Sequence, residues 1–199
     1  MTLDGLRPVA NRALDPFVTA ARRLGLTPNA VSVVAFLLAV AAAGAFYSGG
    51  PAGYLAGATL VFLNGWLDLL DGALARAMDV ASEGGDLLDH VLDRYADIII
   101  IAGLAAGVEA YALGFAAVTG VLMTSYLGTQ AQAVGLDRVY AGLLGRADRL
   151  ALVGLTGAAA AVRPEIRGIS LVVALLVVFA VVGHLTAMQR FYGAMRALD

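Results

Sequence analysis

Long apolar stretches recur along the chain, and they constrain its fold more than any other feature. A helix that crosses the hydrocarbon core of a bilayer needs about 20 mainly apolar residues. Six candidate stretches are separated by short polar or Gly/Pro-containing breaks, at about residues 30–47, 53–77, 85–107, 111–134, 148–162 and 168–192. We therefore predict an all-α integral membrane protein with six transmembrane helices, of which residues 148–162 form the shortest.

The composition agrees with a membrane protein and excludes several other classes. Apolar residues make up 60% of the chain and charged residues 14%, against about 25% charged residues in a soluble domain. The net charge is −2 and no basic stripe with interleaved aromatic residues is present, so we predict no nucleic-acid partner. The absence of cysteine excludes disulfide and thiol chemistry.

The arginines predict the orientation of the helices. With the N-terminus in the cytoplasm, only Arg163 and Arg167 fall on the outer side. This bias obeys the positive-inside rule and requires an even number of spans. We therefore expect both termini in the cytoplasm. The other arginines fall on or near the inner side: Arg7, Arg12, Arg22, Arg23, Arg76, Arg94, Arg138, Arg146, Arg149, Arg190 and Arg196.

The segment before the first span mixes apolar residues with arginines. Residues 5–24 have the pattern of a short amphipathic helix lying in the membrane interface, although an ordinary polar tail is the alternative. Thr27 and Pro28 suit the cap and the first position of the next helix. No cleavable signal peptide is expected. No internal repeat is visible, so residues 1–199 are expected to form one domain, with a transmembrane bundle over residues 30–192.

Residues 68–97 carry seven aspartates, one glutamate and two arginines between two apolar stretches. Asp68 and Asp71 are three positions apart and share a face of the second predicted span. The third span carries a stripe of four aspartates along one face, at Asp86, Asp89, Asp93 and Asp97. Two antiparallel helices would bring these acidic faces together near the cytoplasmic surface.

Such an acidic cluster is costly in a membrane unless it binds something. Carboxylates are hard oxygen ligands that suit Mg²⁺, Mn²⁺ or Ca²⁺, and four of them can hold two ions about 4 Å apart for phosphoryl transfer. The isolation of His90 and His184, without any cysteine, argues against zinc. Gly72 after Asp71, Arg76 one turn later and the pair Gly84-Gly85 leave open backbone beside a basic group. Together they suggest a diphosphate ligand.

The order of these residues resembles the signature of the CDP-alcohol phosphotransferase family, D-x2-D-G-x2-A-R-x8-G-x3-D-x3-D. Every fixed position matches, and the specific part spans residues 68–93. The matching residues are Asp68, Asp71, Gly72, Ala75, Arg76, Gly85, Asp89 and Asp93. The six-helix topology with a leading interfacial helix also resembles the family.

The resemblance implies transfer of a phosphatidyl-type group from a CDP-linked lipid (CDP-diacylglycerol or CDP-archaeol) to a polar alcohol, with release of CMP. It implies Mg²⁺ or Mn²⁺ as cofactor, two ions per site, and a homodimer. Asp93 would also be the base that takes the proton of the attacking hydroxyl. The implied metal ligands are Asp68, Asp71, Asp89 and Asp93. The implied CDP-binding residues are Asp68, Gly72, Ala75, Arg76 and Gly85.

The alcohol acceptor is less constrained. The segment GRADRL and the late arginine Arg190 resemble basic segments of the family branch that uses inositol phosphate. That branch usually carries arginines at the end of the fourth helix, but here the stretch SYLGTQAQAVGLDR has no arginine until Arg138. A phosphorylated polyol such as inositol phosphate is the expected acceptor, and glycerol phosphate is the alternative. The candidate acceptor-phosphate ligands are Arg138, Arg146, Arg149 and Arg190. The same arginines are also explained as topology signals.

Two other classes of function fit parts of the pattern. A divalent-cation transporter would use the carboxylates as an ion path, but its site normally lies near the middle of the bilayer. A structural membrane protein would leave the acidic cluster unexplained. Asn64, one turn before Asp68, either contacts the ligand or makes a packing hydrogen bond.

Overall fold

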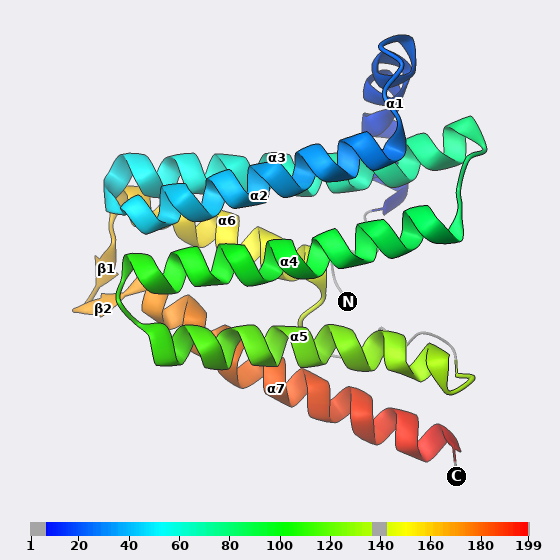
Figure 1. Ribbon diagram of the computed structural model, residues 1–199. Helices are drawn as coiled ribbons and strands as arrows, with labels where there is room; N and C mark the ends of the chain where they lie inside the picture. Colours follow the sequence, from blue (N-terminus) through cyan, green and yellow to red (C-terminus); the bar gives the residue numbers. More distant parts are fainter. Residues whose placement is uncertain (1–6, 137–142, 199) are drawn as a thin grey trace.

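The structure, a computed structural model, describes residues 7–136 and 143–198, with side chains described from residue 13. The described part is almost wholly helical (Figure 1). Its elements are α1 (Arg7–Arg23), α2 (Pro28–Ser48), α3 (Gly50–Met78), α4 (Glu83–Gly107), α5 (Tyr111–Ala133), α6 (Arg146–Val162), β1 (Glu165–Ile166), β2 (Ile169–Ser170) and α7 (Leu171–Leu198). All seven predicted helical segments are confirmed as helices, with boundaries that differ by a few residues.

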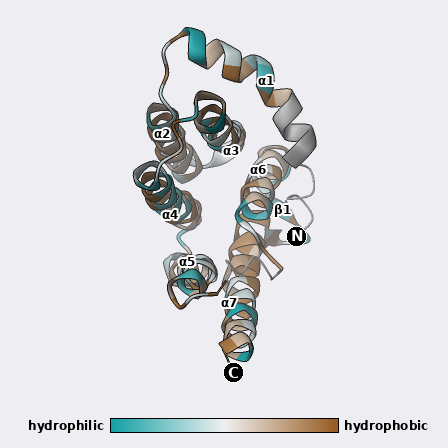
Figure 2. Ribbon diagram, turned by 90° about the vertical axis from the view of Figure 1, so that its right-hand side faces the viewer, coloured by the Kyte–Doolittle hydropathy of each residue, from teal (hydrophilic) through white to brown (hydrophobic). Residues whose placement is uncertain are grey.

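Six of the helices run roughly side by side, and α1 lies across one end of them (Figures 1 and 2). Helix α2 packs on both α3 and α4, α3 also packs on α6, and α5 packs on α7. Helix α1 packs on α3. There the rings of Phe17 and Trp66 lie edge to face, with 5.3 Å between their centroids. The end covered by α1 is the end at which α3 stops and α4 begins, so the acidic stretch lies there.

Local signals fix the chain reversals at this end. The hydroxyl of Thr27 accepts a hydrogen bond from the backbone N–H of Ala30 at 3.2 Å, and Pro28 opens α2, as the sequence predicts. Helix α3 ends at Met78, and the residue that caps it, Asp79, has a left-handed backbone with φ of 56°. Ser82 then caps α4 by accepting from the N–H of Gly85 at 3.1 Å. The turn is therefore short, and it sets α3 and α4 antiparallel.

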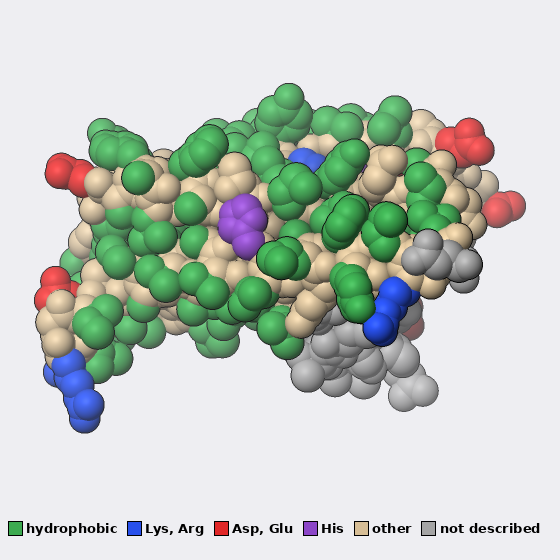
Figure 3. Space-filling model, turned by 90° about the horizontal axis from the view of Figure 1, so that it is seen from below, with side chains coloured by type: hydrophobic (Ala, Val, Ile, Leu, Met, Phe, Trp, Pro, Cys, Tyr) green, Lys and Arg blue, Asp and Glu red, His purple; other side chains and the backbone are tan. Residues whose placement is uncertain are grey.

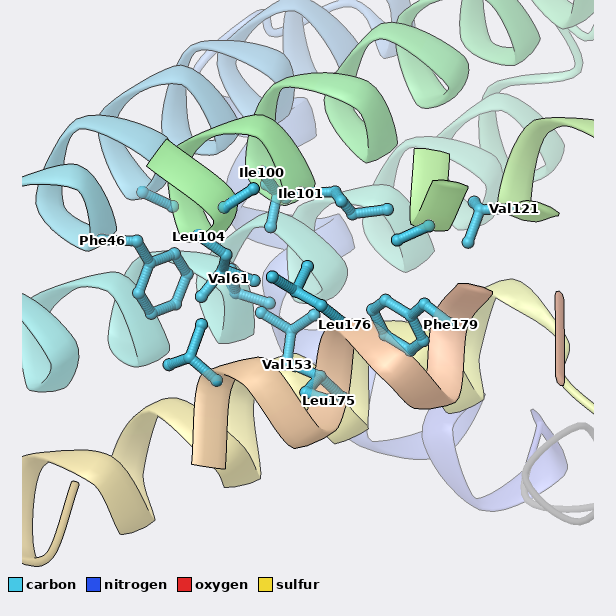
Figure 4. Packing of buried hydrophobic residues seen from close by; sticks show 14 of the residues in the cluster. Phe46, Val61, Ile100, Ile101, Leu104, Val121, Val153, Leu175, Leu176 and Phe179 are labelled. Carbon is cyan, nitrogen blue, oxygen red and sulfur yellow. The ribbon is translucent and has the colours of Figure 1, made fainter. Parts of the chain in front are cut away.

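The main core lies in the middle of the bundle, where α2–α7 meet (Figure 4). Phe46, Leu104, Leu176 and Phe179 are almost fully buried there, and Val153 of α6 joins them. A second cluster joins α1 to α2 and α3 through Leu14, Ala21, Val31, Leu70 and Leu74. Burial of these apolar side chains against each other fixes the helices that carry the charged stretch.

Glycine permits the closest helix approaches. A Cβ on Gly103 of α4 would lie 2.5 Å from the carbonyl oxygen of Ala43 in α2, which no side chain tolerates. Gly120 of α5 and Gly183 of α7 meet in the same way. Gly53, Gly57 and Gly107 likewise leave no room for a Cβ beside their neighbours.

Four of the described helices, α2, α3, α5 and α7, are long and apolar enough to cross a membrane by length and composition. Helix α6 has 17 residues, and the first half of α4 carries the aspartate stripe. Large apolar side chains such as Leu55, Phe62 and Phe115 lie exposed on the outside of the bundle. Hydrophobic side chains cover most of the face in Figure 3, with acidic groups at its ends. Such a surface suits lipid.

The region after α6 differs from the expectation. The sequence indicated a break at Arg163-Pro164 and a helix from about residue 168. Instead β1 and β2 form a two-stranded antiparallel hairpin, with Arg167 at φ 54° and Gly168 at φ 78° in its turn. Helix α7 begins only at Leu171 and continues to Leu198. The hairpin lies at the end of the molecule opposite α1 (Figure 1).

Candidate metal and phosphate site

Three carboxylates from α3 and α4 converge near the covered end of the bundle. One oxygen each from Asp68, Asp71 and Asp89 lie within 4.8 Å of one another. Asp71 is buried, and the other two are partly exposed. A cation that bonds oxygen at about 2.0–2.6 Å brings its ligands to such separations. The donor set therefore fits a hard divalent cation such as Mg²⁺ or Mn²⁺.

The aspartate stripe of α4 divides over different surroundings. Asp89 and Asp93 line the cavity that Asp68 and Asp71 also line. Asp97 lies one turn further into the bundle and is buried. Asp86 is exposed, and one of its oxygens lies 3.5 Å from Nδ1 of His90. The same face of α4 therefore supplies carboxylates to the cavity and, one turn deeper, the carboxylate of Asp97.

Arg146 joins the two helices at the site. Its Nη1 lies 2.5 Å from Oδ2 of Asp68, and its Nη2 lies 2.7 Å from Oδ1 of Asp93. Arg146 is the first residue of α6, which is capped when Asp148 accepts from the N–H of Gly145 at 3.0 Å. The fork of the guanidinium therefore bridges two carboxylates on different helices.

Two polar side chains complete the wall of the cavity. The hydroxyl of Ser32, in α2, donates to Oδ2 of Asp71 at 2.6 Å. Asn64, 1% exposed, donates through Nδ2 to the carbonyl oxygen of Ala35 at 2.8 Å. Ser32 was missed by sequence reasoning, because no local pattern in α2 marks it. The remaining lining residues are apolar: Ala35, Phe36, Leu92 and Ala96.

The residues expected to bind CDP lie beside the carboxylates on the more open side. A Cβ on Gly72 would meet, among described atoms, only Nη1 of Arg76 at 3.3 Å. No other described helix comes within 4 Å of that Cβ position, so packing among the described residues does not explain this glycine. Ala75 is partly buried and Arg76 is exposed. Gly85 lies at the start of α4, where an added Cβ would sit 3.4 Å from Oδ1 of Asn29.

Of the four arginines predicted to bind an acceptor phosphate, the three described ones have different partners. Arg146 lines the cavity. Arg149, 4% exposed, donates through Nη2 to Oδ2 of Asp97 at 2.7 Å, one turn along α6. Arg190 of α7 donates through Nη1 to the carbonyl oxygen of Thr124 in α5 at 2.7 Å. Arg138 lies outside the described residues.

Arg94 is a further basic group near these acids, which the sequence marked only as a topology signal. Its Nη2 lies 3.7 Å from Oδ2 of Asp93, and its Nη1 lies 3.7 Å from Oδ2 of Asp97. A chain of alternating charge therefore runs from Asp68 through Arg146 and Asp93 to Arg94, Asp97 and Arg149. Such alternation offsets the cost of placing charge among apolar helices.

Comparison with known proteins agrees with the motif. Residues 25–183 match the family model for CDP-alcohol phosphatidyltransferase. The archaetidylinositol phosphate synthase of Methanothermobacter thermautotrophicus is 34% identical, over 94% of this chain and 91% of that protein. The protein of the same name from Pyrococcus horikoshii is 31% identical, over 99% of this chain and 98% of that protein.

Solved structures show the same fold. Phosphatidylinositol phosphate synthase of Mycobacterium tuberculosis with CDP-DAG bound superposes with a TM-score of 0.79 at 27% identity, covering 92% of this chain and 94% of that chain. The same enzyme in complex with manganese and citrate gives a TM-score of 0.80 at 26% identity, covering 92% of this chain and 88% of that chain. The sequence match, the shared fold and the intact motif lead to one conclusion: the chain belongs to the CDP-alcohol phosphatidyltransferase family of membrane enzymes.

Proposed function

We propose that this chain is a metal-dependent lipid synthase that transfers a phosphatidyl-type or archaetidyl group from a CDP-linked lipid to inositol phosphate and releases CMP. The observation that carries the proposal is the meeting of Arg146 with the site carboxylates Asp68 and Asp93. A guanidinium, whose fork geometry suits a phosphate, beside a candidate cation site supports this proposal. The relatives named for inositol phosphate lipids support this acceptor over glycerol phosphate.

In this proposal Asp68, Asp71 and Asp89 hold a divalent cation, and Asp93 contributes to a second one. When bound, the cations neutralise the diphosphate and stabilise the charge that develops on its oxygens. Ser32 keeps Asp71 oriented by its 2.6 Å hydrogen bond. All four carboxylates lie on two antiparallel helices, which gives a rigid ligand set.

Asp93 is proposed as the general base. Its carboxylate takes the proton of the acceptor hydroxyl, whose oxygen attacks the phosphorus that carries the lipid. The bond from that phosphorus to the bridging oxygen breaks, and the oxygen leaves with CMP. Gly72, Ala75, Arg76 and Gly85 bind the CDP part, because Gly72 leaves backbone open beside the exposed guanidinium of Arg76.

Arg146 is the acceptor arginine that the geometry favours most directly. Arg149 lies one turn further along α6, held by Asp97, and Arg190 approaches from α7. With Arg138 they form the proposed set for the acceptor phosphate. The glycerol phosphate alternative needs the same charge, so a comparison of acceptors must decide between the two. Membership of an enzyme family disfavours the cation-transporter alternative.

We further propose that all six helices from α2 to α7 cross the membrane and that residues 1–199 form one domain. Helices α4 and α6 pack within the bundle against α2 and α3, so their polar parts are sheltered from lipid. Helix α1 would lie in the cytoplasmic interface, because it crosses the end at which the site lies. Both termini would then be cytoplasmic, and the family likeness supports a homodimer.

Conversion of the CDP-lipid by the purified chain, with Mg²⁺ or Mn²⁺, tests the acceptor. The panel contains inositol 1-phosphate, both enantiomers of glycerol phosphate, free inositol and serine, and the lipid product is identified by mass. The proposal predicts product with inositol 1-phosphate and little with free inositol. Product with glycerol phosphate alone would overturn the acceptor assignment while leaving the reaction class in place.

A further inference from the structure

Asn64 is a buried polar residue on the wall of the cation cavity that the family motif does not include. It precedes Asp68 by four residues and Asp71 by seven on α3, so all three lie on one helix face. All three line the same cavity, and Asn64 is 1% exposed. Its amide is therefore placed among groups that bind ligands.

The orientation of this amide is fixed by its neighbour on α2. The carbonyl oxygen of Ala35 lies 2.8 Å from the terminal amide of Asn64 and can only accept a hydrogen bond. The amide nitrogen must therefore face Ala35, and Oδ1 must be the other atom. Among the described residues, Oδ1 of Asn64 has no hydrogen-bond partner. The hydrogen bond between α3 and α2 therefore uses only the amide nitrogen of Asn64.

A buried acceptor without a donor is unfavourable, so its persistence needs a reason. The described residues that line the cavity donate no hydrogen bond to this oxygen. Asp68 and Asp71 are acceptors when ionised, and the Ser32 hydroxyl is directed to Asp71. Nη1 and Nη2 of Arg146 are directed to Asp68 and Asp93, and its Nε makes no hydrogen bond to Asn64. A donor on a bound ligand would satisfy this oxygen.

We propose that Oδ1 of Asn64 is an additional ligand-binding oxygen of this site, which accepts a hydrogen bond from an O–H group held beside the cation. Two O–H groups fit this chemistry: a water molecule on the cation, or the hydroxyl of the acceptor alcohol. The first alternative would orient the cation shell, and the second would aim the attacking hydroxyl toward its base. The inference rests on the proposed function, because both donors belong to that reaction.

The test compares Asn64→Leu with Asn64→Asp in the full chain. Leucine has a similar size and removes both the hydrogen bond to Ala35 and the proposed hydrogen bond to the ligand. Aspartate loses the hydrogen bond to Ala35 but keeps an acceptor oxygen toward the cavity. Thr124→Val is the matched control for manganese binding and thermal unfolding, because the Thr124 hydroxyl, also buried, donates to the carbonyl oxygen of Gly183 at 2.8 Å and Thr124 does not line the cavity. Manganese affinity by titration without substrate, thermal unfolding and the KM of the acceptor are measured for each variant.

Water as the donor predicts that Asn64→Leu weakens manganese binding by about tenfold, while Asn64→Asp and Thr124→Val bind at least as well as wild type. The acceptor hydroxyl as the donor predicts unchanged manganese binding and an acceptor KM raised by about tenfold in Asn64→Leu, with the KM of the CDP-lipid unchanged. Loss of manganese affinity in both Asn64 variants, or a change in thermal stability alone, would overturn the proposal and leave a packing role.

Failure of the proposed function is separable from failure of this inference. A wild-type chain that binds manganese but releases no CMP with any acceptor would remove the proposed function. The manganese titration alone would then decide the inference, and unchanged binding in Asn64→Leu would overturn it.

Discussion

Arg146 donates through Nη2 to Oδ1 of Asp93 at 2.7 Å, while its Nη1 pairs with Asp68. The guanidinium thus occupies two of the carboxylates that are proposed to bind cations. A cation and this arginine would compete for the same carboxylates. Cation binding would therefore release Arg146 and make it available to the phosphate of the acceptor.

This competition predicts that Arg146→Gln binds Mn²⁺ more tightly than wild type, by about tenfold, because a positive charge at the site is removed. The same variant should lose at least about tenfold in kcat/KM for a phosphorylated acceptor. Manganese titration and initial rates measure the two effects. Arg163→Gln, an exposed arginine at the opposite end, serves as the control. Weaker manganese binding by Arg146→Gln would contradict the competition.

Asp93→Asn should lower turnover by about 10²–10⁴, the usual contribution of a positioned base. Binding of the CDP-lipid and of manganese should be largely retained, because Asp68, Asp71 and Asp89 remain. Rates of CMP release and direct binding of the donor lipid measure these outcomes. Asp86→Asn, which changes an exposed aspartate of the same helix, should behave as wild type. Near-normal turnover of Asp93→Asn would remove this residue as the base.

Gly72→Ala should separate stability from function. Among the described residues, the added Cβ meets only the end of the Arg76 side chain. Alanine stabilises a helix by about 1 kcal/mol relative to glycine. Thermal unfolding should therefore occur at the same or a higher temperature, while the KM of the CDP-lipid rises. Gly103→Ala should instead destabilise the fold, because its Cβ would lie 2.5 Å from a backbone oxygen. An unchanged KM in Gly72→Ala would argue against donor binding at this glycine.

Asp97→Asn should destabilise the fold, because Asp97 is the buried ion-pair partner of Arg149. Both side chains are at most 5% exposed, and removal of one member of such a pair costs about 3–5 kcal/mol. The amide oxygen of asparagine still accepts a hydrogen bond, so we expect a loss at the lower end of this range. Thermal unfolding should show the loss, and the acceptor KM should rise. Glu165→Gln, at the exposed hairpin, should change neither quantity.

Much of the fold follows from the sequence, because helices are encoded locally. The apolar stretches, the cap at Thr27 and the break at Pro164 predicted the described helices, although α7 continues to Leu198 and not to about residue 192. The hairpin after α6 was missed, since each strand has only two residues and no alternating pattern. The spacing of Asp68, Asp71 and Asp89 likewise predicted the convergence of their carboxylates.

Pairings between distant segments were not predictable in this way. The ion pair of Arg149 with Asp97 joins residues 52 positions apart, and the hydrogen bond of Ser32 with Asp71 joins residues 39 positions apart. Their partners are set by how α2 and α6 pack on α3 and α4, for which a single sequence holds no local signal. The aspartate stripe on α4 was seen, but its division between site, ion pair and surface depends on the same packing.

The most direct test of the central claim is metal-dependent release of CMP by the purified chain. The assay contains CDP-diacylglycerol or CDP-archaeol and inositol 1-phosphate, with Mg²⁺ or Mn²⁺ added or chelated. The account predicts CMP release that stops on chelation, returns when either ion is restored and is lost in Asp71→Asn. A folded chain that binds neither manganese nor the CDP-lipid and releases no CMP would contradict it.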